Sequence, residues 1–393
     1  MKFIPYGRQY IDNKDINAVK KALKSDYLTT GPLTEKFESK FKNYVGSKYA
    51  ISCSSGTSAL HLTLLSLNIK KGDVVILPVI NFIASVNMTH ILGAKIYFAD
   101  VNKFNGQMTP QTLELCIKKN KIKKIKAVIT MYNGGDPSNA KQFFKLKKKY
   151  NFFLIEDACH ALGGKYSKLK NFRVGCCKYS DLATFSLHPI KSITTGEGGM
   201  ITTNNKIIYK KLNILKNHGI FKKKREGRNN WDYKILLPGY NYRLSDISCS
   251  LGISQIKKLS KLIAKRNQIF NFYKKKLSKF YDYVILPTKT DDQISANHLF
   301  VIILNKNKLK ISRELVIQKL FRKGIITQVH YIPIYNHPFY KKKCKGNFSG
   351  AKFYYSNCLS LPIFPGLKNK DLRKIINSLG EIINKYKNEK KIY

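Results

Sequence analysis

The chain has 393 residues, enough for two or three domains with a large core, and its 43% hydrophobic and 12% aromatic content excludes an intrinsically disordered protein. No apolar stretch reaches the roughly 18 to 20 residues of a membrane span, and the first residues lack the apolar segment of a signal peptide. We therefore expect a cytoplasmic protein with no membrane partner. The eight cysteines form no C-x-x-C pair and no histidine cluster has zinc-finger spacing, so we expect reduced thiols and no metal site.

The net charge of +49, from 72 basic and 23 acidic residues, is high enough that a nucleic-acid-binding protein must be considered. The lysines, however, are spread along the whole chain, and no single segment interleaves basic and aromatic residues as a stacking groove would. Lysine, asparagine and isoleucine are all abundant, and A/T-rich codons encode these three residues. We therefore expect no specific nucleic-acid partner.

The N-terminal part of the chain carries helical patterns. Apolar residues at helical spacing predict amphipathic helices at residues 12–24 and 33–44. Residues 54–65 then form a turn rich in small hydroxyl residues that leads into an apolar helix. This turn places free backbone N–H groups at the start of a helix.

Short apolar runs separated by helical stretches follow this turn. Runs that are apolar on both faces, alternating with helices, are typical of a largely parallel sheet covered on each side, so we predict an α/β fold. The predicted strands are residues 74–80, 95–101, 127–131, 152–155, 182–187 and 200–203.

The pattern changes near residue 250, where strands become fewer. The chain continues with a long helical pattern, strand-like runs and two further helices. We expect a large domain at residues 1–250 and a smaller C-terminal α+β domain at residues 251–393. The predicted elements of the smaller domain are residues 255–277, 284–286, 298–304, 313–323 and 371–386.

Charged residues occur at the ends of two apolar runs that are predicted to be buried strands. Glu156 and Asp157 end one apolar run, and Lys191 comes just after another, ahead of a glycine-rich turn. Open α/β sheets present ligands at the carboxyl ends of their strands. A lysine there could form a Schiff base, and an aspartate on a neighbouring strand could hold a pyridinium nitrogen. Taken alone, Lys191 is more simply a surface lysine.

Seven short segments occur in order along nearly the whole chain. They are Pro5-Tyr6-Gly7-Arg8-Gln9, Ser25-Asp26-Tyr27-Leu28-Thr29-Thr30-Gly31-Pro32, Ser54-Ser55-Gly56-Thr57-Ser58-Ala59-Leu60-His61, Glu156-Asp157-Ala158-Cys159-His160, Phe185-Ser186-Leu187-His188-Pro189-Ile190-Lys191, Gly239-Tyr240-Asn241-Tyr242-Arg243 and Val329-His330-Tyr331-Ile332-Pro333. Together they resemble the DegT/DnrJ/EryC1/StrS family of pyridoxal-phosphate-dependent sugar aminotransferases. The resemblance implies the type I aminotransferase fold, with a mainly parallel seven-stranded sheet in the large domain.

The resemblance also implies roles for individual residues. Lys191 would hold pyridoxal 5'-phosphate as a Schiff base and later move the proton between substrate and cofactor carbons. Asp157 would pair with the ring nitrogen, because an ionised carboxylate favours the protonated pyridinium.

The remaining cofactor contacts come from the same resemblance. Gly56, Thr57 and Ser186 would bind the phosphate, in keeping with anion binding at a helix N-terminus. Phe82 would stack on the ring and His160 would lie beside it. Each also has a simpler interpretation: Thr57 as an ordinary N-cap, Phe82 as a core residue and His160 as a hydrogen-bonded core histidine.

The family pattern implies a homodimer, because the segment around Asn241 reaches the neighbouring subunit's active site and touches the cofactor phosphate. Other residues would lie on the nucleotide-sugar side of the site. These are Tyr6, Thr30, His188, Arg243, His330, Tyr331 and His337.

Of two comparisons with the family pattern, the first concerns only residue assignments in one loop, and the second concerns the reaction. The loop Tyr132-Asn133-Gly134-Gly135-Asp136-Pro137 departs from relatives that often have a histidine before a small residue and a single glycine. Sugar dehydratases of the family replace the Schiff-base lysine by histidine, so the presence of Lys191 favours a transaminase.

Within the family, His188-Pro189-Ile190-Lys191 and the N-terminal segments are most similar to the pseudaminic-acid branch. Those enzymes aminate C4 of a UDP-linked 2-acetamido-4-keto-6-deoxy hexose of the L-altro configuration, with glutamate as the usual donor. The alternatives are an aminotransferase for another UDP- or dTDP-4-keto-6-deoxyhexose, an enzyme that uses the cofactor for dehydration or amino-acid chemistry, and a basic binding protein without turnover on the same scaffold.

Overall fold

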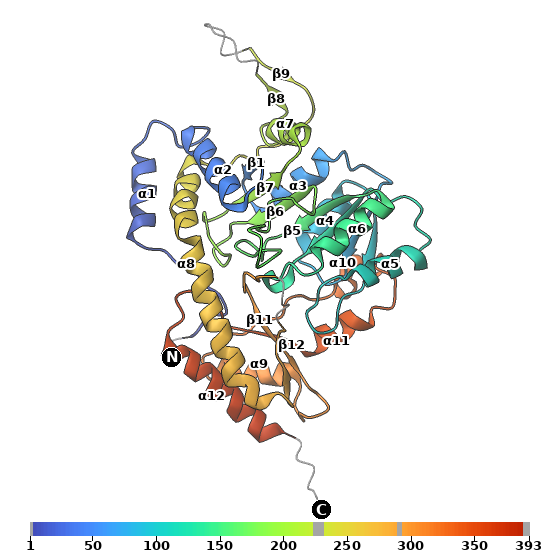
Figure 1. Cartoon of the computed structure of the whole chain (residues 1–393), viewed down its shortest axis with the longest axis vertical. Helices are drawn as coiled ribbons and strands as arrows, with labels where there is room; N and C mark the ends of the chain where they lie inside the picture. The colour runs from blue at the N-terminus through green and yellow to red at the C-terminus, as the bar shows by residue number, and fades with distance from the viewer. Residues whose placement is uncertain (1–2, 223–231, 289–292, 388–393) are drawn as a thin grey trace, which may run out of the picture.

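The computed structural model describes residues 3–222, 232–288 and 293–387. A seven-stranded sheet enclosed by helices forms the upper part of the molecule in Figure 1, and a three-stranded sheet lies below it. The large sheet contains β1 (Tyr49–Cys53), β2 (Val74–Pro78), β3 (Lys95–Ala99), β4 (Ala127–Met131), β5 (Phe153–Asp157), β6 (Leu182–Ser186) and β7 (Gly199–Thr203).

The large sheet has the order β1-β7-β6-β5-β4-β2-β3. The pairs from β3 through β2, β4 and β5 to β6 are parallel, whereas β7 runs antiparallel to both of its neighbours. The expected mainly parallel seven-stranded sheet is therefore confirmed.

Both faces of the sheet are buried, as the uninterrupted apolar runs predicted. On β2, Val75 and Leu77 belong to a core that also holds residues of α3 (Gly56–Ser66) and α7 (Lys206–Leu215). Ile76, between them, belongs to a core on the opposite face with residues of α5 (Pro110–Lys119) and α6 (Ala140–Tyr150). The alternation follows from the period of two in a strand.

The N-terminal helices α1 (Asn13–Leu23) and α2 (Pro32–Val45) occur where the sequence predicted them. Asp12 caps α1 by accepting hydrogen bonds from the N–H groups of Lys14 and Asp15. Gly46, with φ of 83°, ends α2 in a left-handed conformation. Other short elements are α4 (Ile83–Ile91), α10 (Pro338–Lys341), α11 (Ser349–Asn357), β8 (Ile220–Phe221), β9 (Lys234–Ile235) and the 3-10 turns Asn133–Gly135, Ser278–Phe280 and Ile334–Asn336.

The smaller sheet is antiparallel, with the order β10-β11-β12. Its strands are β10 (Val284–Ile285), β11 (Phe300–Leu304) and β12 (Cys358–Leu361). Helices α9 (Arg313–Arg322) and α12 (Asn369–Tyr386) contribute to the core that covers it.

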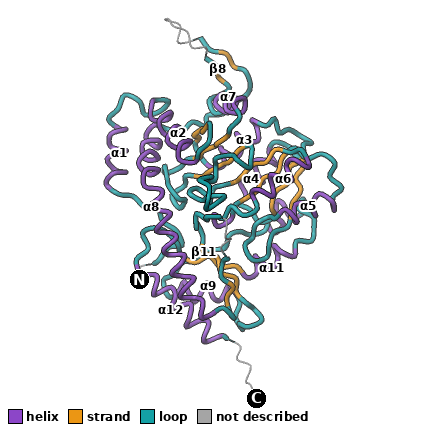
Figure 2. The backbone as a smooth tube through the Cα atoms, in the orientation of Figure 1, coloured by secondary structure: helices purple, strands orange, loops and turns teal. Residues whose placement is uncertain are grey.

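The long helix α8 (Asp246–Leu277) runs from the upper part of the molecule to the lower part (Figures 1 and 2). It contacts α1 and α2 in the upper part and α12 in the lower part. The sequence predicted its start at residue 255, but Ser245 caps it earlier by accepting a hydrogen bond from the Ser248 N–H. Because α8 passes through residue 250, the proposed domain division there stays a prediction.

Among the strands that the structure describes, four were missing from the sequence prediction: β1, β12 and the two-residue strands β8 and β9. β1 contains Ser52, whose N–H and hydroxyl both donate to Glu38 Oε1 at 2.8 Å, so a polar residue is buried in what would otherwise be an apolar run. β12 contains Ser360, whose hydroxyl lies 2.9 Å from His330 Nδ1. In the part of the chain that the structure describes, no helix is long and apolar enough to cross a membrane.

Candidate active site

The loops that follow β5 and β6 bring Asp157 and Lys191 to one edge of the sheet. Asp157 is the last residue of β5 and is 3% exposed. Lys191 lies in the loop after β6, where its N–H donates to the His188 carbonyl at 2.9 Å. The two residues are close enough for their charges to influence each other. The sequence prediction that these side chains share a site agrees with this arrangement.

Burial acts on both groups in the direction of the neutral form. It raises the pKa of Asp157, although the Cys159 N–H, 3.2 Å from Oδ1, and the positive charge of Lys191 oppose this shift. Burial lowers the pKa of the Lys191 amine, and the Arg266 guanidinium lowers it further, while Cys159 and Asp157 act in the opposite direction. Lys191 therefore loses its proton more readily than an exposed lysine, which a nucleophilic amine requires.

The start of α3 packs closely against the end of β6. A Cβ added at Gly56 would lie 2.8 Å from the Ser186 Cβ and 3.2 Å from its hydroxyl. Ser55 caps the helix by accepting from the Ser58 N–H, so the interpretation of Thr57 as the N-cap is wrong. Thr57 is instead exposed in the first turn, and within the described residues the N–H groups of Gly56 and Thr57 have no acceptor. The positive end of the helix is thus open to an anion.

Aromatic residues form another wall of the site. Phe82 is 51% exposed at the start of α4, so it is not a core residue, and its ring centroid lies 5.7 Å from that of Tyr331. The Tyr331 hydroxyl lies 3.0 Å from His160 Nε2. His160 is buried, and its Nδ1 accepts from the Gly134 N–H at 3.4 Å. Burial, and to a lesser extent the charge of Lys191, hold the pKa of His160 well below its usual range, so the ring is neutral.

With this geometry established, comparison with known proteins identifies the family. The model of the DegT/DnrJ/EryC1/StrS aminotransferase family matches residues 9–380. The chain belongs to this family. A Campylobacter jejuni protein named UDP-4-amino-4,6-dideoxy-N-acetyl-beta-L-altrosamine transaminase is 39% identical over 385 residues, covering 98% of both chains.

Solved structures of the same family superpose closely. PseC from Helicobacter pylori, described as an aminotransferase in pseudoaminic acid biosynthesis, has a TM-score of 0.89 and 29% identity, and covers 98% of this chain and 100% of its own. The putative sugar aminotransferase Spr1654 from Streptococcus pneumoniae, in its PLP form, has a TM-score of 0.88 and 27% identity, covering 98% and 99% of the two chains. The expected aminotransferase fold is therefore confirmed.

Pyridoxal phosphate is the cofactor of the DegT/DnrJ/EryC1/StrS aminotransferase family. The residues of this chain fit it. Gly56 lies so close to Ser186 that a Cβ would clash with it, and within the described residues this contact brings the free N–H groups of Gly56 and Thr57 near the Ser186 hydroxyl, as a phosphate would require. The buried Asp157 carboxylate could bind the ring nitrogen, and the Lys191 amine could form a Schiff base with the aldehyde carbon. Within the described residues, no cluster of three or more histidine, cysteine or acidic residues could hold a metal ion.

The glycine-rich loop that departs from the family pattern has a physical explanation. Gly135 has φ of 97°, and a Cβ on it would lie 2.5 Å from the His160 carbonyl oxygen. A second glycine is therefore required for the loop to pass this close to His160. Tyr132, which precedes the glycines, donates to Glu156 Oε1 at 2.6 Å, away from the Asp157 side of the strand.

Replacement of Glu156 by glutamine tests this buried contact. Tyr132 and Tyr166 both donate to the Glu156 carboxyl, but burial still raises its pKa to about 6. A raised native pKa contributes stability below the unfolded value, and this contribution is lost as pH rises through about 6. The unfolding free energy of Glu156→Gln, relative to wild type, should therefore increase by about 2 kcal/mol between pH 4.5 and 7.5. Urea unfolding across this range measures it, and a constant difference would contradict the expectation.

The residues expected on the sugar side occupy separate places. Thr30 and Arg243 line one cavity of about 130 Å³, in which Arg243 donates to Asn217 Oδ1 at 2.6 Å. The buried carboxylate of Asp246 holds the adjoining loop by accepting from the N–H groups of Gly31 and Leu33 at 3.0 Å. Thr30 and Arg243 thus lie at one cavity, and their role on the nucleotide-sugar side stays a prediction.

Other predicted residues lie nearer the aromatic wall or outside it. The ring of Tyr6 lies 5.7 Å from that of His330, which is 4% exposed. His188 is in the Lys191 loop, and its N–H donates weakly to the Ser186 hydroxyl at 3.4 Å. His337 caps the short helix α10 through its backbone, and no contact joins it to Lys191 or Asp157 in the part of the chain described.

Asn241 lies at the base of the β8–β9 hairpin, which projects from the body of the molecule in Figure 1. Its side chain is exposed and its backbone pairs with Asn217. The next residue, Tyr242, accepts a hydrogen bond from the Ser54 N–H at 2.9 Å, so this segment passes beside the start of α3.

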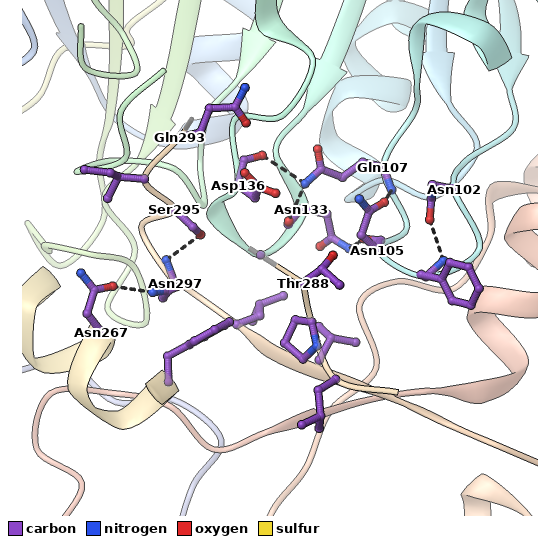
Figure 3. Close-up of a pocket in the computed structure, with 18 of the residues that line it drawn as sticks. Asn102, Asn105, Gln107, Asn133, Asp136, Asn267, Thr288, Gln293, Ser295 and Asn297 are labelled. Carbon is purple, nitrogen blue, oxygen red and sulfur yellow. Dashed lines mark hydrogen bonds between the residues drawn. The ribbon is translucent and has the colours of Figure 1, made fainter. Parts of the chain in front are cut away.

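A larger cavity of about 540 Å³ lies between the loops after β3 and β4 on one side and α8, β10 and the segment leading into β11 on the other (Figure 3). One side is rich in carboxamides, where Gln107 Nε2 donates to the carbonyls of Asn133 and Asp136. Asn133 belongs to the same turn as Gly134, the hydrogen-bond donor to His160. The cavity is therefore joined to His160 through this turn, and no pattern in the sequence indicated it.

The sequence analysis also missed two buried residues. His298 is 4% exposed, and its ring centroid lies 4.2 Å from that of His160. Arg266 is 1% exposed in α8 and adjoins the Lys191 loop. One signal for Arg266 was available, because it falls on the apolar stripe formed by Leu262, Ile263 and later residues of the helix.

Proposed function

We propose that this enzyme transfers the amino group of glutamate to C4 of a UDP-linked 4-keto-6-deoxy-N-acetylhexosamine, in pseudaminic-acid-type nucleotide-sugar biosynthesis. The observation that carries the proposal is the 39% identity, over 98% of both chains, to a transaminase named for the product UDP-4-amino-4,6-dideoxy-N-acetyl-beta-L-altrosamine. The placement of Lys191, Asp157 and the Gly56–Ser186 contact supports the same reaction.

The roles of the residues follow from their environments. Bound pyridoxal phosphate supplies an electron sink for the carbanion that transamination must form. Asp157 would hold the ring nitrogen protonated, since an ionised carboxylate favours the pyridinium and the Cys159 N–H, 3.2 Å from Oδ1, opposes the effect of burial on the carboxyl pKa. Lys191 would take the proton from the α-carbon of glutamate and, in the second half-reaction, donate a proton to C4 of the sugar. The lowered pKa of its amine suits both steps.

The other cofactor contacts are proposed for the residues at the Gly56–Ser186 contact and the aromatic wall. Gly56, Thr57 and Ser186 would bind the phosphate, and Phe82 would cover one face of the ring. His160, which is neutral and held between Gly134 and Tyr331, would orient the ring without adding a charge.

The quaternary structure and substrate side are part of the same proposal. The exposed Asn241 would complete the phosphate site of a neighbouring subunit in a homodimer. The residues proposed near the nucleotide sugar are Tyr6, Thr30, His188, Arg243, His330, Tyr331 and His337. The cytoplasmic location expected from the sequence stays a prediction.

Substitution of Gly56 by alanine tests the phosphate site. The new methyl group would approach the Ser186 Cβ to 2.8 Å, closer than carbon atoms pack, and would push apart the two segments whose groups are proposed to hold the phosphate. We expect the affinity for pyridoxal phosphate to fall by about tenfold or more, since overpacking costs about 1–3 kcal/mol. Fluorescence titration of the apoenzyme measures this. Gly366→Ala is the control, because its Cβ would meet nothing closer than 3.8 Å; equal affinities in the two variants would exclude Gly56 from the site.

The visible absorption spectrum tests the function directly. The purified enzyme with pyridoxal phosphate should show a Schiff-base band that disappears when glutamate is added, with stoichiometric release of 2-oxoglutarate. The aminated form should then be discharged by the UDP-linked 4-keto sugar of the L-altro configuration faster than by dTDP-linked or differently configured keto sugars. A preference for one of the latter would overturn the substrate, and the lack of a Schiff-base band would overturn the reaction.

A further inference from the structure

Arg266 is the buried cation nearest the Lys191 loop. It projects from the middle of α8, and only 1% of its surface is exposed. Its Nη1 donates to the carbonyl oxygens of His298 and Ile363 at 3.1 Å and 2.9 Å, and its Nη2 approaches the Ile190 carbonyl at 3.5 Å. The guanidinium thus meets the main chain of three segments that are far apart in the sequence.

These three segments surround the active site. Ile190 directly precedes Lys191, and the ring of His298 lies 4.2 Å from that of His160, tilted by 32°. Ile363 follows β12, and its N–H donates to the Tyr6 carbonyl at 3.1 Å. A single side chain therefore connects the Lys191 loop, the His160–His298 pair and the end of the smaller sheet.

Among the residues that the structure describes, no anionic side chain pairs with Arg266. Its Nε also has no hydrogen-bond acceptor among them. An unpaired buried charge is expensive, and main-chain carbonyl dipoles offset only part of this cost. Burial lowers the pKa of Arg266 to about 10, so the group remains charged at neutral pH.

The effect of the Arg266 charge on Lys191 is seen by comparison with the other groups that shift the pKa of the Lys191 amine. Asp157 and Cys159 favour the charged amine, whereas Arg266 disfavours it. His160, His298 and His330 also face this region, and burial keeps the pKa of each below its usual range, so they add no positive charge at neutral pH. Arg266 is thus the cation that remains charged at neutral pH and disfavours a proton on Lys191, whereas the Asp157 carboxylate favours one.

We propose that Arg266 is a positioning residue that fixes the Lys191 loop through the Ile190 carbonyl and, by its unpaired charge, makes the Lys191 nitrogen lose its proton more readily. This inference rests on the proposed function of Lys191 as the Schiff-base residue. A neutral side chain at position 266 would leave the loop less restrained and the nitrogen more basic, both in the free amine and in the Schiff base.

The test compares Arg266→Met, which removes the charge, with Arg266→Lys, which retains it. The first readout is the pH titration of the Schiff-base absorption band. The second is the reactivity of Lys191 in the apoenzyme toward trace acetic anhydride at each pH, read by peptide mass spectrometry. Arg313→Lys is the matched control, because Arg313 is also a buried arginine that bonds a carbonyl, that of Tyr355, far from the Lys191 loop in sequence.

We expect Arg266→Met to raise both midpoints by about one pH unit, the effect of one nearby charge, and to reduce Lys191 acetylation at pH 7.5 about tenfold. Arg266→Lys should restore most of the shift, and Arg313→Lys should show none. Unchanged midpoints in folded Arg266→Met would overturn the proposal, as would an equal shift in Arg266→Lys. If Arg266→Met does not fold, Arg266→Gln replaces it in the same comparison. Absence of the Schiff-base band in wild type would instead refute the proposed function, and the acetylation titration would still decide the role of Arg266.

Discussion

Replacement of Lys191 by alanine is expected to reduce transamination by about 10⁴-fold or more, because one amine serves as both the covalent attachment point and the proton carrier. The Schiff-base band should also be lost. The fold should be retained, since Lys191 is only half-buried and its side chain makes no hydrogen bond within the described residues. Steady-state assays with glutamate and the keto sugar, together with the visible spectrum, measure both effects.

The control for this substitution is Lys178→Ala, which removes an exposed lysine that precedes β6. It should leave the activity and the spectrum unchanged. Addition of a small primary amine should partly restore turnover in Lys191→Ala if the missing function is proton transfer. Retention of the band in Lys191→Ala would mean that another lysine holds the cofactor.

Substitution of Asp157 by asparagine is expected to lower turnover by about 10²- to 10³-fold, the range found when one preorganised electrostatic contact is removed. The amide keeps the shape of the carboxyl group but cannot hold a proton on the ring nitrogen, so the electron sink weakens. Glutamate binding should change much less than the rate of proton removal. Single-turnover kinetics with α-deuterated glutamate would show this as a larger isotope effect.

The neighbouring carboxyl group provides a matched control for Asp157. Glu156 is equally buried, one residue earlier in the same strand, but it is held by Tyr132 and Tyr166 on the other face of the sheet. Glu156→Gln should therefore retain near-normal turnover. Equal losses in the two variants would indicate that the strand, and not the ring nitrogen, is affected.

Much of the architecture could be predicted from the sequence because each buried strand has a continuous apolar run and each helix a clear period. Strands β1 and β12 are exceptions to this regularity. β1 and β12 were missed because Ser52 and Ser360 interrupt their apolar runs, and both hydroxyls are hydrogen-bonded to residues distant in the sequence. The antiparallel direction of β7 likewise depends on a chain reversal that strand composition does not encode.

The chemistry-bearing residues were predictable to the extent that they lie in short local patterns. Asp157 and Lys191 each follow an apolar run, so their meeting at one sheet edge could be anticipated. His298 and Arg266 could not be assigned in this way. Their importance arises from the packing of segments that begin far from Lys191 in the chain, and only the folded arrangement brings them to it.

The course of α8 has a consequence for engineering the protein. Because one continuous helix serves both sheets, an exchange of the C-terminal half with that of a relative must join the two sequences inside a helix. A join that adds or removes one residue would rotate everything beyond it by about 100° and shift it by about 1.5 Å. Hybrid enzymes of this kind must therefore match the helical phase of α8 as well as the sequence on either side of the junction.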